Sequence, residues 1–417
     1  MSPVDKILKA GCMKPKLRAI WDAGVAAADP VGAVERALPS VDLGDPSKLT
    51  VVAVGKAAPN MIAPVLAQLT PKKALVVTHR ENQVGDIKAD VMRAGHPVPD
   101  PEGEAAANAI CDLAEAMGRD EHLLILISGG ASAMLPAPRK GITLQDKIRV
   151  TEALLASGAP IEVMNIVRQQ LSRIKGGGLA RLASPAKVTA LVLSDVIGDD
   201  LRAVASGPTL PPLGTPKDAI EALRSYFCWG KVGQDVRNLL HENQNLGPVP
   251  KTDTRIISSN SKSVEVMAEA AKEGKILTPP LLGDVTDASE RLAALPSGLW
   301  LIGGECTVQI KGKGKGGRNQ ELALRMALIA EREGWPAGWT YLQGGSDGRD
   351  GPTDAAGAIV NSQTLKKMRA AGVDPVAALK DNDSYHALKA AGDLLVTEAT
   401  GTNVADLGVL YKPESWL

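Results

Sequence analysis

The stretch LTVVAVGKAAPNM, residues 49–61, joins a continuous apolar run to a glycine–lysine turn and the start of a helix. Strands that are apolar on both sides are typical of parallel sheets, because helices cover both faces of such a sheet. Similar apolar runs begin at residues 73, 122 and 187. Helix-like segments between these runs cover residues 101–117, 144–156 and 161–173. The alternation predicts an α/β protein with a doubly wound parallel sheet.

The pattern changes near the middle of the chain. Stretches rich in proline and glycine occur at 207–216 and 243–254, and they favour a loose connection. Beyond them the strand-like runs are shorter, and one long helix is predicted at 320–333. Because 417 residues exceed one ordinary core, we expect an α/β domain over 1–250 and a smaller mixed α/β domain over 251–417.

Composition argues against several classes of protein. Lysine plus arginine equals aspartate plus glutamate, at 47 each, and aromatic residues make up 3%, so nucleic-acid binding is not expected. The chain has no apolar run long enough for a membrane span and no apolar signal core, so we expect a cytoplasmic protein. Its four cysteines lack a CxxC pair and predict free thiols rather than a zinc site. A monomer and a homodimer are both compatible with the sequence.

The densest motif is GGECTVQIKGKGKGGRNQE, residues 303–321. It predicts a strand, a glycine-rich basic loop and the start of a helix. Glycines let backbone amides approach a phosphate, and an arginine can bind an anion with two hydrogen bonds. A solvated, lysine-rich surface loop is the alternative. The predicted anion contacts are Gly316, Gly317, Arg318 and Asn319, with Glu305 beside them as a candidate metal ligand.

The same loop also matches GxGxxG, the fingerprint of dinucleotide-binding proteins, at Gly312, Gly314 and Gly317. That fingerprint requires an acidic residue about twenty positions further on, at the end of a second strand. Here Glu331 and Glu333 fall at the polar end of the predicted helix. The match therefore gives little support for a nicotinamide cofactor.

Two other predicted strands end in loops that suit phosphate. Lys56 directly follows the first strand, where its ammonium can pair with a phosphate, although a lysine that faces water is the alternative. The turn after the strand at 122 offers amides and hydroxyls for a phosphate, and a purely structural tight turn is equally compatible. The candidate residues of this turn are Ser128, Gly129, Gly130 and Ser132.

Acidic residues follow two further strands. Asp195 comes directly after the strand that begins at 187, and Asp347 lies in the glycine-rich stretch GGSDGRDGPTDAAG. Carboxylates beside phosphate sites suit Mg²⁺, which takes a few carboxylates together with substrate oxygens. Helix caps and turn-forming aspartates are the alternatives. We predict Asp195 as the catalytic base or a metal ligand, and Asp347 as a metal ligand.

Taken together, the motifs resemble the glycerate 2-kinase family with a C-terminal MOFRL domain, some members of which are labelled hydroxypyruvate reductase. The motifs that carry the resemblance are VGKAAPNM, GHPVPD, LISGGASAM, LSRIKGG, LSDVIGDDLRAVASGPT, GGECTVQIKGKGKGGRNQELAL, SDGRDGPTDAAGA, NDSYHAL and TGTNVADL. The resemblance implies a Rossmann-like N-terminal domain and a smaller α/β MOFRL domain. It also implies phosphorylation of D-glycerate at its 2-hydroxyl with ATP and Mg²⁺, and it makes Lys56 and Arg318 catalytic.

Two other functions stay open at this point. One is a hydroxypyruvate reductase that uses NAD(P)H, and the other is a protein that binds glycerate or a nucleotide without catalysis. The reductase requires a ribose-binding acid that the sequence does not supply. A binding protein would not require so many acids beside phosphate loops.

Overall fold

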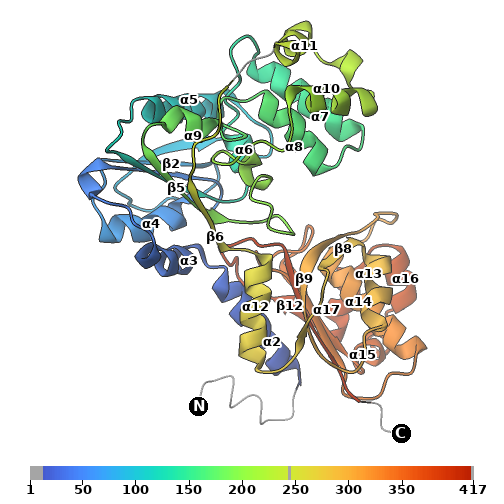
Figure 1. The fold of residues 1–417 in the computed structure, drawn as a ribbon. Helices are drawn as coiled ribbons and strands as arrows, with labels where there is room; N and C mark the ends of the chain where they lie inside the picture. The colour runs from blue at the N-terminus through green and yellow to red at the C-terminus, as the bar shows by residue number, and fades with distance from the viewer. Residues whose placement is uncertain (1–12, 243–245, 415–417) are drawn as a thin grey trace. The chain divides into compact units, whose positions relative to one another are not determined.

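The computed structural model describes residues 13–242 and 246–414 and forms two compact units (Figure 1). Unit 1 contains the segment that ends at Asp29, the short segment Asp195–Gly198 and the chain from Ser258 onward. Unit 2 contains Pro30–Ser194 and Asp199–Ile257. This division differs from a single boundary near residue 250, because the first described helix and the segment after the fifth strand group with the C-terminal part of the chain.

Unit 2 is built on a six-stranded sheet in the order β3-β2-β1-β4-β5-β6, and the pairs from β3 through β5 are parallel. The strands are β1 (Leu49–Val54), β2 (Lys73–His79), β3 (Asp90–Ala94), β4 (His122–Ile127), β5 (Lys187–Leu193) and β6 (Asp253–Ser258). Every residue of β1 and β4 is buried, as their continuous apolar sequences predicted. The strand order reverses between β1 and β4, and open α/β sheets bind ligands at such a switch point.

Helices cover this sheet and form a separate bundle beside it. Side chains of α3 and α4 pack on β1 and β4, and α5 contacts β3 and α9. Four helices, α7, α8, α10 and α11, share an apolar core of their own, and Figure 1 shows them grouped together. The helices of unit 2 are α3 (Pro30–Ala37), α4 (Ala58–Gln68), α5 (Pro101–Glu115), α6 (Ala131–Met134), α7 (Leu144–Ala156), α8 (Ile161–Gln170), α9 (Gly178–Ala183), α10 (Pro216–Ser225) and α11 (Gln234–His241), with short 3-10 helices η1 (Leu38–Ser40), η2 (Pro46–Lys48), η3 (Val204–Ser206) and η4 (Trp229–Lys231).

Unit 1 is built on a mixed sheet in the order β12-β11-β10-β13-β9-β7, with β8 paired to β9. The pairs from β12 to β9 are antiparallel, whereas β7 and β8 run parallel to β9. The strands are β7 (Lys275–Ile276), β8 (Leu281–Asp284), β9 (Gly298–Thr307), β10 (Thr340–Gly345), β11 (Ala355–Asn361), β12 (Leu394–Val396) and β13 (Asp406–Lys412). This confirms the mixed α/β class predicted for this part of the chain.

Helices cover both faces of the mixed sheet, because neighbouring residues of a strand point to opposite sides. Leu342 of β10 packs with Trp21 of α2 and Met267 of α12. The adjacent Tyr341 packs in a second core with Met326 of α14. The helices of unit 1 are α2 (Met13–Ala27), α12 (Asn260–Ala271), α13 (Val285–Ala293), α14 (Arg318–Arg332), α15 (Thr364–Ala370), α16 (Pro375–Lys380) and α17 (Ser384–Ala391).

Two expectations from composition can be compared with the described residues. None of the helices within 13–242 and 246–414 combines the length and the apolar character required to cross a membrane. Cys111, Cys228 and Cys306 are buried free thiols, and Cys12 lies outside the described residues.

Candidate functional sites

In unit 2, the carboxyl ends of β1 and β4 bring Lys56 beside the turn that begins at Ser128. The amide of Lys56 donates to the carbonyl oxygen of Gly129 at 2.9 Å, and the amide of Ala57 donates to Ser128 Oγ at 3.1 Å. A Cβ atom at Gly55 would lie 2.3 Å from Ser128 Oγ, so only glycine allows this approach. Two motifs predicted to bind phosphate are therefore neighbours, and the side chain of Lys56 is exposed.

The residues of the turn have different roles. Ser128 is buried, and its hydroxyl both accepts the amide of Ala57 and donates to the carbonyl oxygen of Val54, so it holds the turn together. This is the structural alternative that the sequence left open for Ser128. Gly130 has a φ of 85°, and a Cβ atom there would lie 3.1 Å from the ring of His96. Burial lowers the pKa of His96, and the charge of Lys56 lowers it further.

Ser132 contacts two cations that the sequence analysis did not single out. Arg168 Nη2 donates to Ser132 Oγ at 2.8 Å. Lys175 Nζ donates to the same oxygen at 2.6 Å and to the carbonyl oxygen of Ser132 at 3.0 Å. Lys175 lies in the LSRIKGG motif, directly before a glycine pair, and that position was the available signal. Arg168 had no signal, because an arginine on an amphipathic helix usually faces water.

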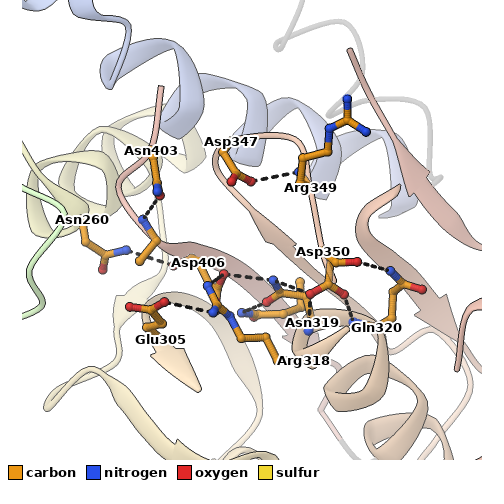
Figure 2. A network of polar contacts seen from close by, with 12 residues as sticks. Asn260, Glu305, Arg318, Asn319, Gln320, Asp347, Arg349, Asp350, Asn403 and Asp406 are labelled. Atoms are coloured by element: carbon orange, nitrogen blue, oxygen red, sulfur yellow. Dashed lines mark hydrogen bonds and ion pairs between the residues drawn. The ribbon is translucent and has the colours of Figure 1, made fainter. Parts of the chain in front are cut away.

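In unit 1, Arg318 is the centre of a polar network (Figure 2). Its Nε and Nη2 donate to the two carboxylate oxygens of Asp406, at 2.7 and 3.0 Å. Its Nη1 lies 2.9 Å from Glu305 Oε1. Burial opposes the charge of Arg318, but the hydrogen bonds and charge of Asp406 outweigh it and raise the pKa of Arg318. The guanidinium is therefore a permanent, rigidly oriented cation. Asp406 begins β13 and lies in the TGTNVADL motif.

Asn319 and Asp350 hold the start of α14. Both oxygens of Asp350 accept backbone amides, from Asn319 at 3.1 Å and from Gln320 at 2.8 Å. The side chain of Asn319 is buried, donates to Asp350 and Asp406, and accepts from Gln343. The helix N-terminus that was predicted to bind phosphate is thus bound to a carboxylate of the chain itself. The Asn319 side chain, a predicted anion contact, is thus hydrogen-bonded within the chain to Asp350, Asp406 and Gln343.

The glycine-rich loop before α14 is also bound internally. The amides of Lys311 and Gly312 donate to Asn382 Oδ1, at 2.7 and 2.9 Å. The amides of Lys313 and Lys315 donate to the carboxylates of Asp381 and Asp383, both at 2.9 Å. The loop glycines permit this close approach, since a Cβ atom at residue 312 would lie 2.2 Å from a backbone oxygen of residue 381.

The two glycines that end the loop, Gly316 and Gly317, also lie too close to neighbouring segments to accept a side chain. A Cβ atom at Gly316 would lie 2.2 Å from Ser384 Oγ, and one at Gly317 would lie 2.3 Å from the carboxylate of Asp350. A side chain at either position would therefore clash with a neighbouring segment. Their lack of a side chain allows α17 and the loop that carries Asp350 to pack closely.

Glu305, the second ion-pair partner of Arg318, lies near two other acidic side chains. Partial burial raises the pKa of Glu305, Arg318 opposes this rise, and the negative charges of Asp406 and Asp195 add to it. Asp195 therefore lies close enough to Glu305 to repel it, within unit 1. A divalent cation would relieve this repulsion, so the carboxylates present are compatible with Mg²⁺.

Asp347 lies in the β10–β11 loop, where its Oδ1 accepts the amide of Arg349 at 2.9 Å. This is an aspartate turn, the alternative considered for this residue. Across the described ranges, no three His, Cys, Asp or Glu side chains gather as a ready-made metal centre. Mg²⁺ commonly takes one or two carboxylates together with substrate phosphates, so a complete protein cage is not required.

The chain matches two protein-family models and is similar to known proteins over most of its length. Residues 16–241 match a family model described as a domain of unknown function, DUF4147, and residues 298–406 match the MOFRL family. A D-glycerate 2-kinase from Thermotoga maritima is 39% identical over 91% of this chain and 93% of its own length. A putative hydroxypyruvate reductase from Agrobacterium vitis is 40% identical over 94% and 92%. The crystal structure of a Thermotoga maritima glycerate kinase superimposes with a TM-score of 0.87 at 36% identity, covering 94% of this chain and 97% of that one.

Proposed function

Because the chain belongs to the glycerate kinase family with DUF4147 and MOFRL domains, we propose that it transfers a phosphoryl group from ATP to the 2-hydroxyl of D-glycerate. The products would be ADP and 2-phosphoglycerate. The observation that carries the proposal is a division of charge: cations gather at the strand ends of unit 2, whereas carboxylates surround Arg318 in unit 1. Phosphoryl transfer requires mainly positioning and charge neutralisation, which such groups supply.

The strand-end residues of unit 2 support binding of phosphate oxygens. Lys56 has an exposed ammonium at the switch point of the sheet, next to the turn at Gly129. An ammonium there would neutralise charge on the transferring phosphoryl group. Gly129 and Gly130 leave room for an oxygen to approach the backbone, and Ser132 presents a hydroxyl held by two cations.

The network of unit 1 supports binding of the acceptor. Arg318 is fixed by Asp406, and the fork of its guanidinium suits the glycerate carboxylate or the transferring phosphoryl group. Asp195 is the proposed acceptor for the proton of the 2-hydroxyl, and the raised pKa of Glu305 makes that side chain a second candidate. Glu305 and Asp195 would hold Mg²⁺ together with substrate oxygens, and the ion would neutralise charge on those oxygens.

The reductase function has less support. The observation that favours it is that the relative from Agrobacterium vitis is named a putative hydroxypyruvate reductase. A dinucleotide fingerprint works through free amides that approach a pyrophosphate. In this chain the amides of the glycine loop are bound to Asp381, Asn382 and Asp383, so the GxGxxG match serves internal packing.

A direct assay tests the proposal. Purified protein with ATP, Mg²⁺ and D-glycerate should release ADP, and ³¹P NMR of the product should show 2-phosphoglycerate rather than the 3-isomer. EDTA should stop the reaction, and excess Mg²⁺ should restore it. With hydroxypyruvate, absorbance loss of NADH or NADPH should not exceed the rate without protein. Rapid oxidation of the nicotinamide together with no release of ADP would contradict the kinase proposal.

A further inference from the structure

A cluster of cations lies beside Ser132, where the helical bundle of unit 2 meets the loops of its sheet. Lys147 comes from α7, Arg168 from α8 and Lys175 from the loop before α9. Lys147 is 9% exposed and Lys175 is 5% exposed. Arg168 is partly exposed and donates to the same serine oxygen as Lys175. Three chain segments thus bring positive charge to one place in the interior.

The cluster has no carboxylate partner within ion-pair distance in the described part of the chain. Lys147 donates to the carbonyl oxygen of Leu171 at 3.1 Å, and Lys175 donates to Ser132. Burial lowers the pKa of Lys175 well below its usual value, and the charges of Arg168 and Lys147 add to this. Burial likewise lowers the pKa of Lys147 to about 7, although Glu104 opposes the shift. Buried like charges without a counter-ion destabilise a fold unless an anion joins them.

The groups around Ser132 have unused capacity for such an anion. An arginine has five N–H donors, and Arg168 uses one of them on Ser132 among the residues described. The hydroxyl of Ser132 lies 3.1 Å from Ser206 Oγ, which in turn donates to Asn165 Oδ1. That chain of hydroxyls fixes the orientation of Ser132. Both Ser132 and Arg168 keep some exposed surface.

We propose that Arg168 and Lys175, which meet at Ser132, bind a phosphate dianion, with Lys147 as a further balancing charge. A dianion matches several converging cations better than a carboxylate, which carries a single charge. Ser132 lies in α6, which follows the turn at the end of β4, so the site is next to that turn. The dianion belongs either to the nucleotide or to the phosphorylated product. That choice rests on the proposed kinase function, whereas binding of phosphate itself does not.

Thermal unfolding with inorganic phosphate tests the site. Phosphate at about ten times its Kd should raise the Tm of the wild-type protein by roughly 1–3 °C over sodium chloride of equal ionic strength. Lys175→Met keeps the length of the side chain and removes its charge. We expect this variant to have a higher Tm than wild type without phosphate and to lose most of the phosphate-induced rise. Lys140→Met, at an exposed lysine of the same unit, should behave as wild type.

The outcomes separate a ligand site from a structural role. A purely structural Lys175 predicts a lower Tm for Lys175→Met and an unchanged phosphate-induced rise, and either result overturns the proposal. Absence of any phosphate-specific rise in the wild-type protein also overturns it. If Lys175→Met is insoluble, Arg168→Gln provides the same comparison through the partly exposed cation.

Calorimetric titrations with ADP, 2-phosphoglycerate and D-glycerate identify the source of the phosphate. Weakening by Lys175→Met of ADP binding alone assigns the site to the nucleotide, and weakening of 2-phosphoglycerate binding alone assigns it to the product. Equal weakening of D-glycerate would instead indicate a carboxylate site and contradict the proposal. A phosphate-specific effect without ADP release from ATP and D-glycerate leaves the site in place and overturns the kinase function. Kinase activity without a phosphate-specific effect supports the kinase function and overturns the proposed phosphate site.

Discussion

Arg318 and Asp406 form a two-bond ion pair that joins the first residue of α14 to the first residue of β13. Nε lies 2.7 Å from Oδ2 and Nη2 lies 3.0 Å from Oδ1, and the side chain of Asp406 is 2% exposed. The carboxylate also accepts from Asn319 at 2.9 Å. The carboxylate of Asp406 thus accepts three hydrogen bonds, two of them from the guanidinium. Because these two bonds are parallel, they fix the guanidinium in one orientation. Asp406, 88 positions further along the chain, thereby sets the orientation of the positive charge of Arg318.

Arg318→Lys tests the importance of that direction. Lysine keeps the positive charge but cannot reproduce the planar fork, so kcat should fall about 10²- to 10³-fold while the protein stays folded. Steady-state kinetics with ATP and D-glycerate measure the loss, and circular dichroism checks the fold. Arg325→Lys, which changes an arginine of the same helix paired with Glu321, should keep near wild-type turnover. Equal kinetics for the two variants would remove Arg318 from the catalytic residues.

Glu305→Gln should change the acid limb of the pH profile. The pKa of Glu305 is raised by partial burial and by neighbouring acids, so its ion pair with Arg318 weakens at a higher pH than an ordinary glutamate would allow. In wild type, kcat/KM should therefore fall as the pH drops toward this raised pKa. In Glu305→Gln the overall rate should be lower and this limb should shift or disappear. Glu290→Gln, at an exposed partner of Arg332, is the control, and an unchanged limb in Glu305→Gln would exclude Glu305 as its source.

Lys147→Met should alter how stability depends on pH. The pKa of Lys147 is about 7 in the folded protein and about 10.4 in an unfolded chain. Between these values the unfolded state binds more protons, so the free energy of unfolding of the wild type rises with pH. The charged neighbours that enter this balance are Arg168, Lys175 and Glu104.

Denaturant titrations from pH 7 to pH 10 measure this effect. Lys147→Met should be more stable than wild type near pH 7, and its advantage should shrink as the pH rises. Lys140→Met should follow the wild-type curve. A constant difference between Lys147→Met and wild type at every pH would mean that folding does not shift the pKa of Lys147.

Asn382→Ala tests the internal docking of the glycine loop. Its side chain accepts the amides of Lys311 and Gly312 and donates to Glu321, so the variant should lose roughly 1–3 kcal/mol of stability. Hydrogen exchange of the amides at 311–315 should accelerate, whereas exchange in β10 should not change. Asn361→Ala, which removes a single turn contact to Gln363, should leave the loop amides protected. Unchanged protection in Asn382→Ala would mean that Asp381 and Asp383 hold the loop without it.

The apolar periodicity of the sequence determined the fold class and the positions of the strand-end motifs. The continuous apolar runs at β1 and β4 are buried throughout, and Lys56 and the Ser128 turn follow them as predicted. Local pattern suffices there, because a strand covered on both faces must be apolar at every position. The motif from Gly303 likewise led to Arg318 at the start of a helix.

Tertiary structure alone decided which charges meet. Asp406, Asp350 and Asp381–Asp383 come from distant segments, and they occupy the donors that the glycine loop and α14 had been expected to offer to phosphate. Conversely, Lys175, Arg168 and Lys147 converge from separate segments, and nothing in the local sequence of Arg168 or Lys147 distinguishes them from exposed cations. A donor or a charge is available to a ligand only if the rest of the fold leaves it unpaired, and that pairing depends on contacts across the whole chain rather than on neighbours in sequence.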